Sequence, residues 1–208
     1  MFLNVSLVIV FVFSVVLHEI GHGYMAYFLG DSTAKNEGRL TLNPIPHISM
    51  FGTIIIPGIL LLFQTPFLFG WAKPVPYNPY NLRGRYGEVL VAIAGPLMNV
   101  LIALVCAAVF RFMGESISAG IANFLFIIVL FNLFLAFLNM LPIPPLDGYK
   151  VLSAILPFEY RSRIETLFSP THANGIALMI FVLLCIVYFL SGYLANGVMT
   201  VATLLLYS

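Results

Sequence analysis

Long apolar runs separated by short polar segments dominate this chain. Runs at about residues 3–29, 89–112, 120–140 and 175–194 are each long enough to cross a bilayer, which takes ~20 apolar residues in an α-helix. A shorter run at 197–207 favours a tilted or interfacial helix. The pattern predicts an all-α polytopic membrane protein with about four full spans.

A further apolar run, at residues 51–69, is interrupted by a proline–glycine pair at 57–58. We expect this run to form a re-entrant or hairpin segment packed against the other helices. Just before it, Arg39–Leu42 alternates between polar and apolar side chains. That alternation predicts a small β element near residues 37–43.

The composition supports a membrane protein and excludes a nucleic-acid-binding one. Of the 208 residues, 61% are hydrophobic and only 8% are charged, which no soluble domain of this size needs. The formal net charge of +1 provides no basic field for nucleic acid. No polar stretch is long enough to be a second domain, so we expect residues 1–208 to form a single transmembrane domain.

The placement of basic residues indicates how the chain crosses the membrane. If 51–69 re-enters without crossing, eight of the nine Lys and Arg residues share one face. Full crossing would split them six against three. The positive-inside rule favours the first arrangement, with an outside N-terminus and a basic cytoplasmic face in the cell membrane. The eight residues are Lys35, Arg39, Lys73, Arg83, Arg85, Lys150, Arg161 and Arg163.

The first apolar run contains the sequence HEIGH at residues 18–22. On a helix, His18 and His22 lie one turn apart on the same face, where both imidazoles can reach one metal ion. Glu19 lies beside them, and no Lys or Arg between Met1 and Leu29 compensates its charge. An isolated carboxylate at this depth costs about 2.5–3.5 kcal/mol on insertion scales. The pattern therefore predicts a zinc site, and the alternative is histidines hydrogen-bonded between helices.

A catalytic zinc needs a third protein ligand, and the sequence offers several. We favour Asp147, because it follows an apolar span within NMLPIPPLDG, where three prolines prevent a regular helix and Gly148 permits a tight turn. The alternative for Asp147 is an ordinary turn aspartate or an aspartate that caps the next helix. The other candidates are Glu88, His47, His172 and Glu159.

Three motifs together resemble the site-2 protease family of intramembrane zinc metalloproteases: HEIGH, AGPLMN at 94–99 and NMLPIPPLDG at 139–148. GWAKPVPYNP at 70–79 resembles the compact members, which have no PDZ-like or CBS-like domain. The resemblance implies one Zn²⁺ per chain, bound by His18, His22 and Asp147, with Glu19 as catalytic base. It also implies transmembrane helices as substrates.

Two amides in apolar spans, Asn99 and Asn139, are further catalytic candidates. Each could stabilise an oxyanion or hold the substrate backbone, and the alternative is interhelical hydrogen bonding. A helical substrate must unwind before cleavage. The segment Arg39–Leu42 could then pair with the unwound substrate, or it could simply tether the chain to the membrane surface.

Two other functions fit some of these features. A membrane metal transporter would need ionisable ligands along a path, whereas here they converge on one site. A metal-stabilised scaffold without activity would not need the glutamate. Besides the lipid bilayer and a transmembrane protein substrate, we leave open a homo-oligomer or a regulatory membrane partner.

Overall fold

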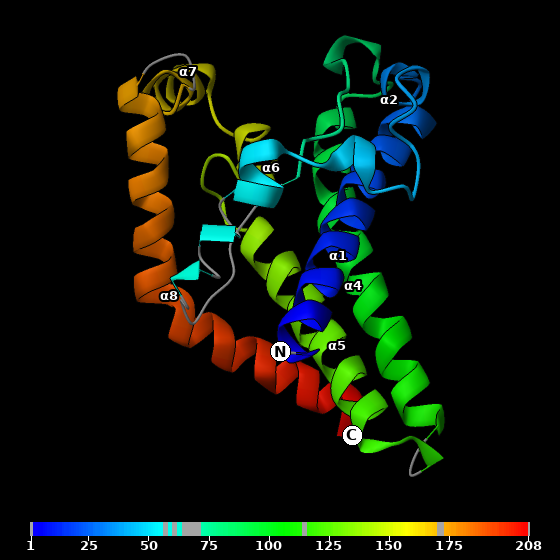
Figure 1. Cartoon of the computed structure of the whole chain (residues 1–208). Coiled ribbons are helices and arrows are strands. Elements are labelled where there is room, and N and C mark those ends of the chain that lie inside the picture. The colour runs from blue at the N-terminus through cyan, green and yellow to red at the C-terminus, as the bar shows by residue number, and fades with distance from the viewer. Residues whose placement is uncertain are drawn as a thin grey trace. The chain divides into compact units, whose positions relative to one another are not determined.

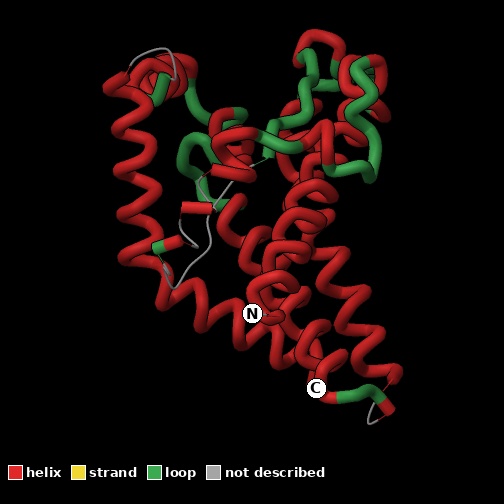
Figure 2. The backbone as a smooth tube through the Cα atoms, viewed as in Figure 1, coloured by secondary structure: helices red, strands yellow, loops and turns green. Residues whose placement is uncertain are grey.

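The computed structural model describes residues 2–55, 58–59, 62–63, 72–113, 116–169 and 173–207. The described residues are helical or irregular and contain no strand (Figure 2). The chain divides into two compact units, Met1–Asn99 and Val100–Ser208. The division falls within one helix, α4 (Gly87–Met113), which begins in the first unit and ends in the second.

The first unit is organised around helix α1 (Phe2–Phe28), which runs beside the first turns of α4 (Figure 1). The close approach depends on glycine: a Cβ on Gly21 would lie 2.8 Å from the carbonyl oxygen of Ala94. Small residues at such a contact let two apolar helices pack closely where no hydrophobic driving force acts between them.

Helix α1 ends at Phe28 and is capped at Gly30. Gly30 has a φ of 108°, a left-handed conformation that other residues rarely adopt. Its N–H bonds to Tyr27 O at 3.1 Å, and the Asp31 N–H bonds to Ala26 O at 2.9 Å. These two bonds form a Schellman cap, which satisfies carbonyls at the helix end.

Short helical elements follow α1 in the first unit. Their bounds are α2 (Thr33–Asn36), the 3₁₀ turns η1 (Ile45–His47) and η3 (Pro79–Asn81), and the π-helical turn η2 (Met50–Ile55). Most of the expected re-entrant segment at 51–69 lies outside the described residues, so its path stays a prediction.

The predicted β element near residues 37–43 is wrong, because this segment consists of turns and bends. Local hydrogen bonds take up its polar groups instead. The Arg39 N–H bonds back to Ala34 O at 2.9 Å. The Asn43 N–H bonds to Thr41 Oγ1 at 3.2 Å, and Asn43 Oδ1 accepts from the Ile45 N–H at 3.1 Å. Such side-chain bonds to the backbone compete with strand pairing.

The second unit has an apolar interior. After the end of α4 come α5 (Ala119–Asn139), α6 (Asp147–Ser153), α7 (Phe158–Leu167) and α8 (Ala173–Tyr207). The buried core is drawn from α4, α5 and the last part of α8. Its members are Ala103, Ala107, Val129, Leu133, Val198, Ala202 and Leu206.

Helix α8 joins two runs that the sequence analysis separated. We expected a span at 175–194 and a distinct short helix at 197–207, whereas one helix covers both and changes direction along its length (Figure 1). Only Asn196 and Gly197 mark the expected break, and no proline lies there. A lone glycine costs a helix only about 1 kcal/mol, so the helix continues.

Among the described residues, three helices are long and apolar enough to cross a membrane: Leu7–Phe28, Gly87–Met113 and Ala119–Asn139. They correspond to the first, second and third predicted spans. The protein is therefore a helical membrane protein. The expected total of about four spans stays a prediction.

Candidate metal centre

Two buried histidines on α1 form the centre of the candidate site. His18 and His22 are 6% and 7% exposed, and their Nε2 atoms are 3.1 Å apart. The rings meet edge to face, with centroids 4.7 Å apart and an interplanar angle of 88°. The predicted one-turn spacing thus brings both imidazoles to one point.

The outer nitrogen of each ring is held by the first part of α4. His22 Nδ1 lies 2.6 Å from the carbonyl oxygen of Val91, which can only accept a hydrogen bond. His18 Nδ1 lies 2.6 Å from Asn99 Oδ1, and Asn99 Nδ2 bonds to Ser14 O at 3.4 Å. Both Nδ1 atoms therefore donate, which fixes the tautomers and ring orientations.

With Nδ1 as the donor, an uncharged imidazole carries a lone pair on Nε2, and the two Nε2 atoms face one another. Such lone pairs repel at 3.1 Å unless a proton or a cation lies beside both. Two nitrogen ligands ~2.0–2.1 Å from a tetrahedral zinc ion lie roughly 3.3 Å apart, close to the observed separation. The spacing and the donor chemistry of the pair therefore fit zinc.

A glycine on α4 makes room for the two rings. A Cβ on Gly95 would collide with His22 Nε2 and would lie 2.7 Å from His18 Cε1. The next residue, Pro96, has no N–H to give the carbonyl of Ala92, so this turn has one hydrogen bond fewer than a regular helix. The glycine of the AGP sequence thus allows α4 to lie close to the two histidine rings.

Glu19 contacts a different segment, the one that carries Val75. Its Oε2 accepts the N–H of Val75 at 2.9 Å, and its side chain is half-buried. Successive helical residues differ by about 100° around the axis, which is why Glu19 does not share the orientation of the histidines. The contact anchors one carboxylate oxygen.

Asp147 is the first residue of α6 in the second unit, and it is 7% exposed. Lys150 Nζ bonds to its Oδ1 at 3.3 Å. The residue at the N-cap position is Leu146, so Asp147 is not the capping aspartate of the alternative interpretation. The predicted role of Gly148 in a turn is wrong: it lies within α6, and a Cβ there would meet the backbone of Met140 and Leu141.

Comparison with known proteins decides the family. Residues 6–115 and 108–188 match peptidase family M50. The chain is 38% identical over 186 residues to "Putative zinc metalloprotease YwhC" of Bacillus subtilis, covering 86% of this chain and 78% of the relative. It is 29% identical over 178 residues to "Zinc metalloprotease MJ0392" of Methanocaldococcus jannaschii, covering 86% of this chain and 42% of that relative. No solved structure matches the chain significantly.

This chain belongs to peptidase family M50. It is a zinc metalloprotease with a site-2-protease-like function, and zinc is its cofactor. The resemblance inferred from HEIGH, AGPLMN and NMLPIPPLDG is therefore confirmed. The assignment of the metal-binding and catalytic residues stays a prediction.

The second amide candidate of this M50 protease differs from the first. Asn139 is half-buried at the end of α5, and its Nδ2 bonds to the carbonyl of Leu135 one turn earlier, at 3.0 Å. Asn99 is fully buried and bonds to His18. The catalytic role suggested for each amide stays a prediction.

The other candidates for a third ligand have different surroundings. His47 is 1% exposed, and its Nε2 donates to Thr41 O at 3.1 Å. Burial lowers the pKa of His47, and the charge of Arg39 lowers it further. The hydrogen bond to the Thr41 carbonyl and the charge of Glu19 act in the opposite direction, but the net pKa lies below the ordinary value of 6.5. Glu88 is half-buried in the first turn of α4, and Glu159 is exposed on α7. His172 lies outside the described residues.

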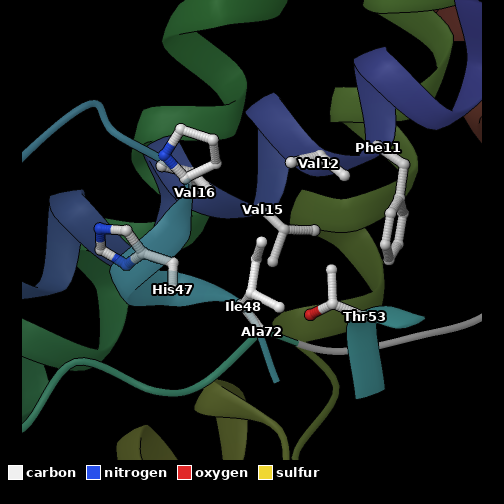
Figure 3. Close-up of a pocket in the computed structure, with 9 residues that line it drawn as sticks. Phe11, Val12, Val15, Val16, His47, Ile48, Thr53 and Ala72 are labelled. Atoms are coloured by element: carbon white, nitrogen blue, oxygen red, sulfur yellow. The ribbon is translucent and has the colours of Figure 1, made fainter. Parts of the chain in front are cut away.

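His47 also borders a small cavity of about 10 Å³ on one side of α1 (Figure 3). The cavity is otherwise lined mainly by apolar side chains, and Val12, Val15 and Val16 of α1 contribute to it. Its size is about that of one water molecule, so it cannot hold a peptide.

Sequence reasoning missed several groups that shape the site. The carbonyl of Val91 and the N–H of Val75 are backbone groups, which no residue type reveals. Gly95 and Arg39 carried weaker signals: a glycine before a proline within a span, and a charged residue beside apolar ones.

Proposed function

We propose that this M50 protease is an intramembrane zinc endopeptidase that hydrolyses peptide bonds within or near transmembrane segments of membrane proteins. One observation carries the proposal: the histidine pair is buried in a helix of span length, with Glu19 between its members. A protease whose metal ligands lie within a membrane-spanning helix meets substrates that share the bilayer.

For the metal, we assign His18, His22 and Asp147 as the three ligands. The orientation of the ring pair supports the first two. The burial of Asp147 supports the third, because a buried carboxylate needs cationic or hydrogen-bonding partners, of which Lys150 is one and a metal ion would be another. Two imidazoles and one carboxylate are an established ligand set for catalytic zinc.

The reaction is hydrolysis with Glu19 as general base and then general acid. Zinc, when bound, polarises the scissile carbonyl and makes water a stronger acid. Glu19 accepts a proton from the attacking water as the new C–O bond forms. It then donates that proton to the leaving amine as the C–N bond breaks. The Val75 N–H holds Oε2, which leaves Oε1 for the water.

The substrate we propose is a transmembrane helix that unwinds locally before cleavage. Backbone groups within a helix are hydrogen-bonded to one another, so the scissile carbonyl is shielded until the helix opens. The segment Arg39–Leu42 is not a strand, and its turns fit the membrane-surface tether better than edge pairing with substrate. We place the protein in the cell membrane with its active site toward the cytoplasm, from the distribution of Lys and Arg.

The test is cleavage of single-span substrates by the purified protein in detergent. We expect a chelator to abolish cleavage and zinc to restore it. Glu19→Gln should retain zinc and lose cleavage, because the amide cannot accept the proton. Helix-breaking residues in the substrate should increase the rate. Zinc-dependent cleavage that persists undiminished in Glu19→Gln would overturn the assigned base, and no cleavage of any substrate would overturn the proteolytic function.

A further inference from the structure

Val75 is bound to α1 both through its backbone N–H and through its side chain. The Val75 N–H bonds to Glu19 Oε2 at 2.9 Å, and the Val75 side chain is 6% exposed. That side chain packs against α1 at Gly23, one turn after Glu19, where an added Cβ would lie 2.9 Å from Val75 Cγ1. The segment that carries Val75 is thus seated on the same helix face as the glutamate.

The residues just before Val75 are held by Arg39. Arg39 is 5% exposed, and its Nη2 donates to the carbonyl of Lys73 at 2.8 Å and to the carbonyl of Pro74 at 3.2 Å. The Lys73 N–H bonds in turn to His47 O at 2.8 Å. One guanidinium therefore bonds to the Lys73 carbonyl and to the Pro74 carbonyl, and the Pro74 carbonyl belongs to the same planar peptide unit as the N–H bound to Glu19.

The backbone of Arg39 is bonded to α2, and the next residue, Leu40, packs beside Gly23 of α1. The Arg39 N–H bonds to Ala34 O at 2.9 Å. A Cβ on Gly23 would lie 2.5 Å from Leu40 Cδ2. Consecutive residues, Arg39 and Leu40, thus hold the Lys73–Val75 segment and pack on α1 beside it.

This arrangement has an energetic cost. Among the described residues, Arg39 Nε has no hydrogen-bond partner although it is buried. Leaving a buried donor unsatisfied costs about 1–3 kcal/mol, more for a charged group. A loop that only needed to be stable could use a neutral side chain here, so the cost indicates that the position of the carbonyls matters for function.

We infer that Arg39 is a positioning residue for Glu19, acting through the Lys73–Val75 segment. By fixing the Lys73 and Pro74 carbonyls it sets the direction of the Val75 N–H, and that N–H sets the rotamer of the carboxylate. The inference rests on the proposed role of Glu19 as the base. It adds a residue outside the proposed set of metal ligands, whose loss misplaces the base and leaves the metal bound.

The decisive comparison is Arg39→Ala against Arg39→Lys, with Arg161→Ala as control. Arg161 is a half-exposed arginine in the second unit that pairs with Glu165 at 2.8 Å. We expect Arg39→Ala to lower kcat ~10–100-fold, since displacing a catalytic group by about 1 Å costs on the order of 100-fold. KM and zinc per chain should stay unchanged. Arg39→Lys keeps one donor and should recover part of the loss. Arg161→Ala should resemble wild type.

A second measurement follows the amides directly and needs no substrate. Hydrogen exchange resolved to single residues should be faster at Lys73 and Val75 in Arg39→Ala. In Glu19→Gln it should be faster at Val75 but not at Lys73, because the neutral amide is a weaker acceptor. Gly23→Ala displaces Val75 from the helix side and should also expose Val75, which keeps the test available if Arg39→Ala does not fold.

The results separate this inference from the proposed function. Protein that cleaves nothing but shows the exchange pattern would refute proteolysis and leave the contact chain standing. Wild-type kcat per bound zinc in Arg39→Ala would overturn the inference, and so would equal loss of zinc and activity. Unchanged exchange at Val75 in that variant would overturn it as well.

Discussion

The two units of this M50 protease are both apolar and helical, yet their interiors are built differently. In the first unit, His47, Asn99 and Asp31 are among the largest fully buried side chains. In the second, the core at Val129 and Leu133 is an apolar cluster. Its buried amide, Asn132, bonds to the carbonyl of Ile128 one turn earlier, at 2.9 Å.

The difference shows how a membrane protein fixes side-chain geometry. Packing in an apolar core holds helices together but tolerates changes of shape and volume. A hydrogen bond between elements, such as that between His18 and Asn99, fixes distance and direction at once. The first unit has such bonds at the two histidines that we propose as metal ligands. Substitutions matched across the two units test this contrast.

The largest expected effect comes from removing a ligand in one unit and a core side chain in the other. His22→Ala should abolish zinc binding and cleavage, because one Nε2 donor is lost. Leu133→Ala should retain one zinc per chain and cost about 2–4 kcal/mol in stability, from the cavity it leaves. Metal analysis and thermal unfolding in detergent measure both. If His22→Ala kept stoichiometric zinc, the ligand assignment would fall.

The two amides provide the next comparison. Asn99→Leu removes the acceptor of His18 Nδ1, and we expect zinc affinity to fall ~10–100-fold, as for other residues that orient metal ligands. Asn139→Leu should change zinc affinity less than about threefold, because its partner lies in its own helix. Competition with a chelator of known affinity measures both. Equal effects would remove the distinction drawn between the amides. Unchanged turnover in folded Asn139→Leu would end its catalytic candidacy.

Alanine substitutions at two glycines compare a position in close contact with the histidine rings with a position that faces open space. Gly95→Ala should displace the histidine rings, with about 1–3 kcal/mol lost from stability and weaker zinc binding. Gly197→Ala in α8 meets nothing within 4 Å and should be neutral or stabilise by up to about 1 kcal/mol. Unfolding temperature and zinc titration measure both, and a harmless Gly95→Ala would mean that the rings do not need this space.

The smallest expected effect on zinc binding and cleavage comes from Asp31, which contributes a pH-dependent part of the stability. Burial raises the pKa of its carboxyl, but hydrogen bonds outweigh burial and the net pKa lies below the ordinary value of 3.8. The donors are Thr33, Asn81 and Asn78.

Because the folded pKa is depressed, the stabilisation is present above about pH 4. It is lost as pH falls through the lowered value. Asp31→Asn should cost about 1–3 kcal/mol at neutral pH and flatten that loss. Glu165→Gln, in a largely exposed ion pair, should change little. Unfolding measured from pH 7 to pH 3 checks this prediction. A loss of stability at low pH that persists undiminished in Asp31→Asn would contradict it.

Periodicity and residue type predicted much of this molecule. Apolar runs located α1, α4 and α5 to within a few residues, and HEIGH located the histidine pair, because both signals depend on local spacing along one helix.

The failures came where distant segments decide the structure. Alternation at Arg39–Leu42 suggested a strand, but the guanidinium turns to the carbonyls of Lys73 and Pro74. Gly148 was read as a turn residue, whereas the backbone of Met140 lies against it. Neither contact leaves a local signal in the sequence.

The backbone groups between Lys73 and Val75 already have hydrogen-bond partners, and this matters for inhibitor design. Both carbonyls before Val75 are held by a guanidinium, two N–H groups already have acceptors, and Pro74 has none to offer. A peptidomimetic designed to lie alongside this stretch as an added strand would find few groups to pair with. A compound that competes for the Val75 N–H is a better design, because it would release the Glu19 carboxylate from this hydrogen bond without touching the metal.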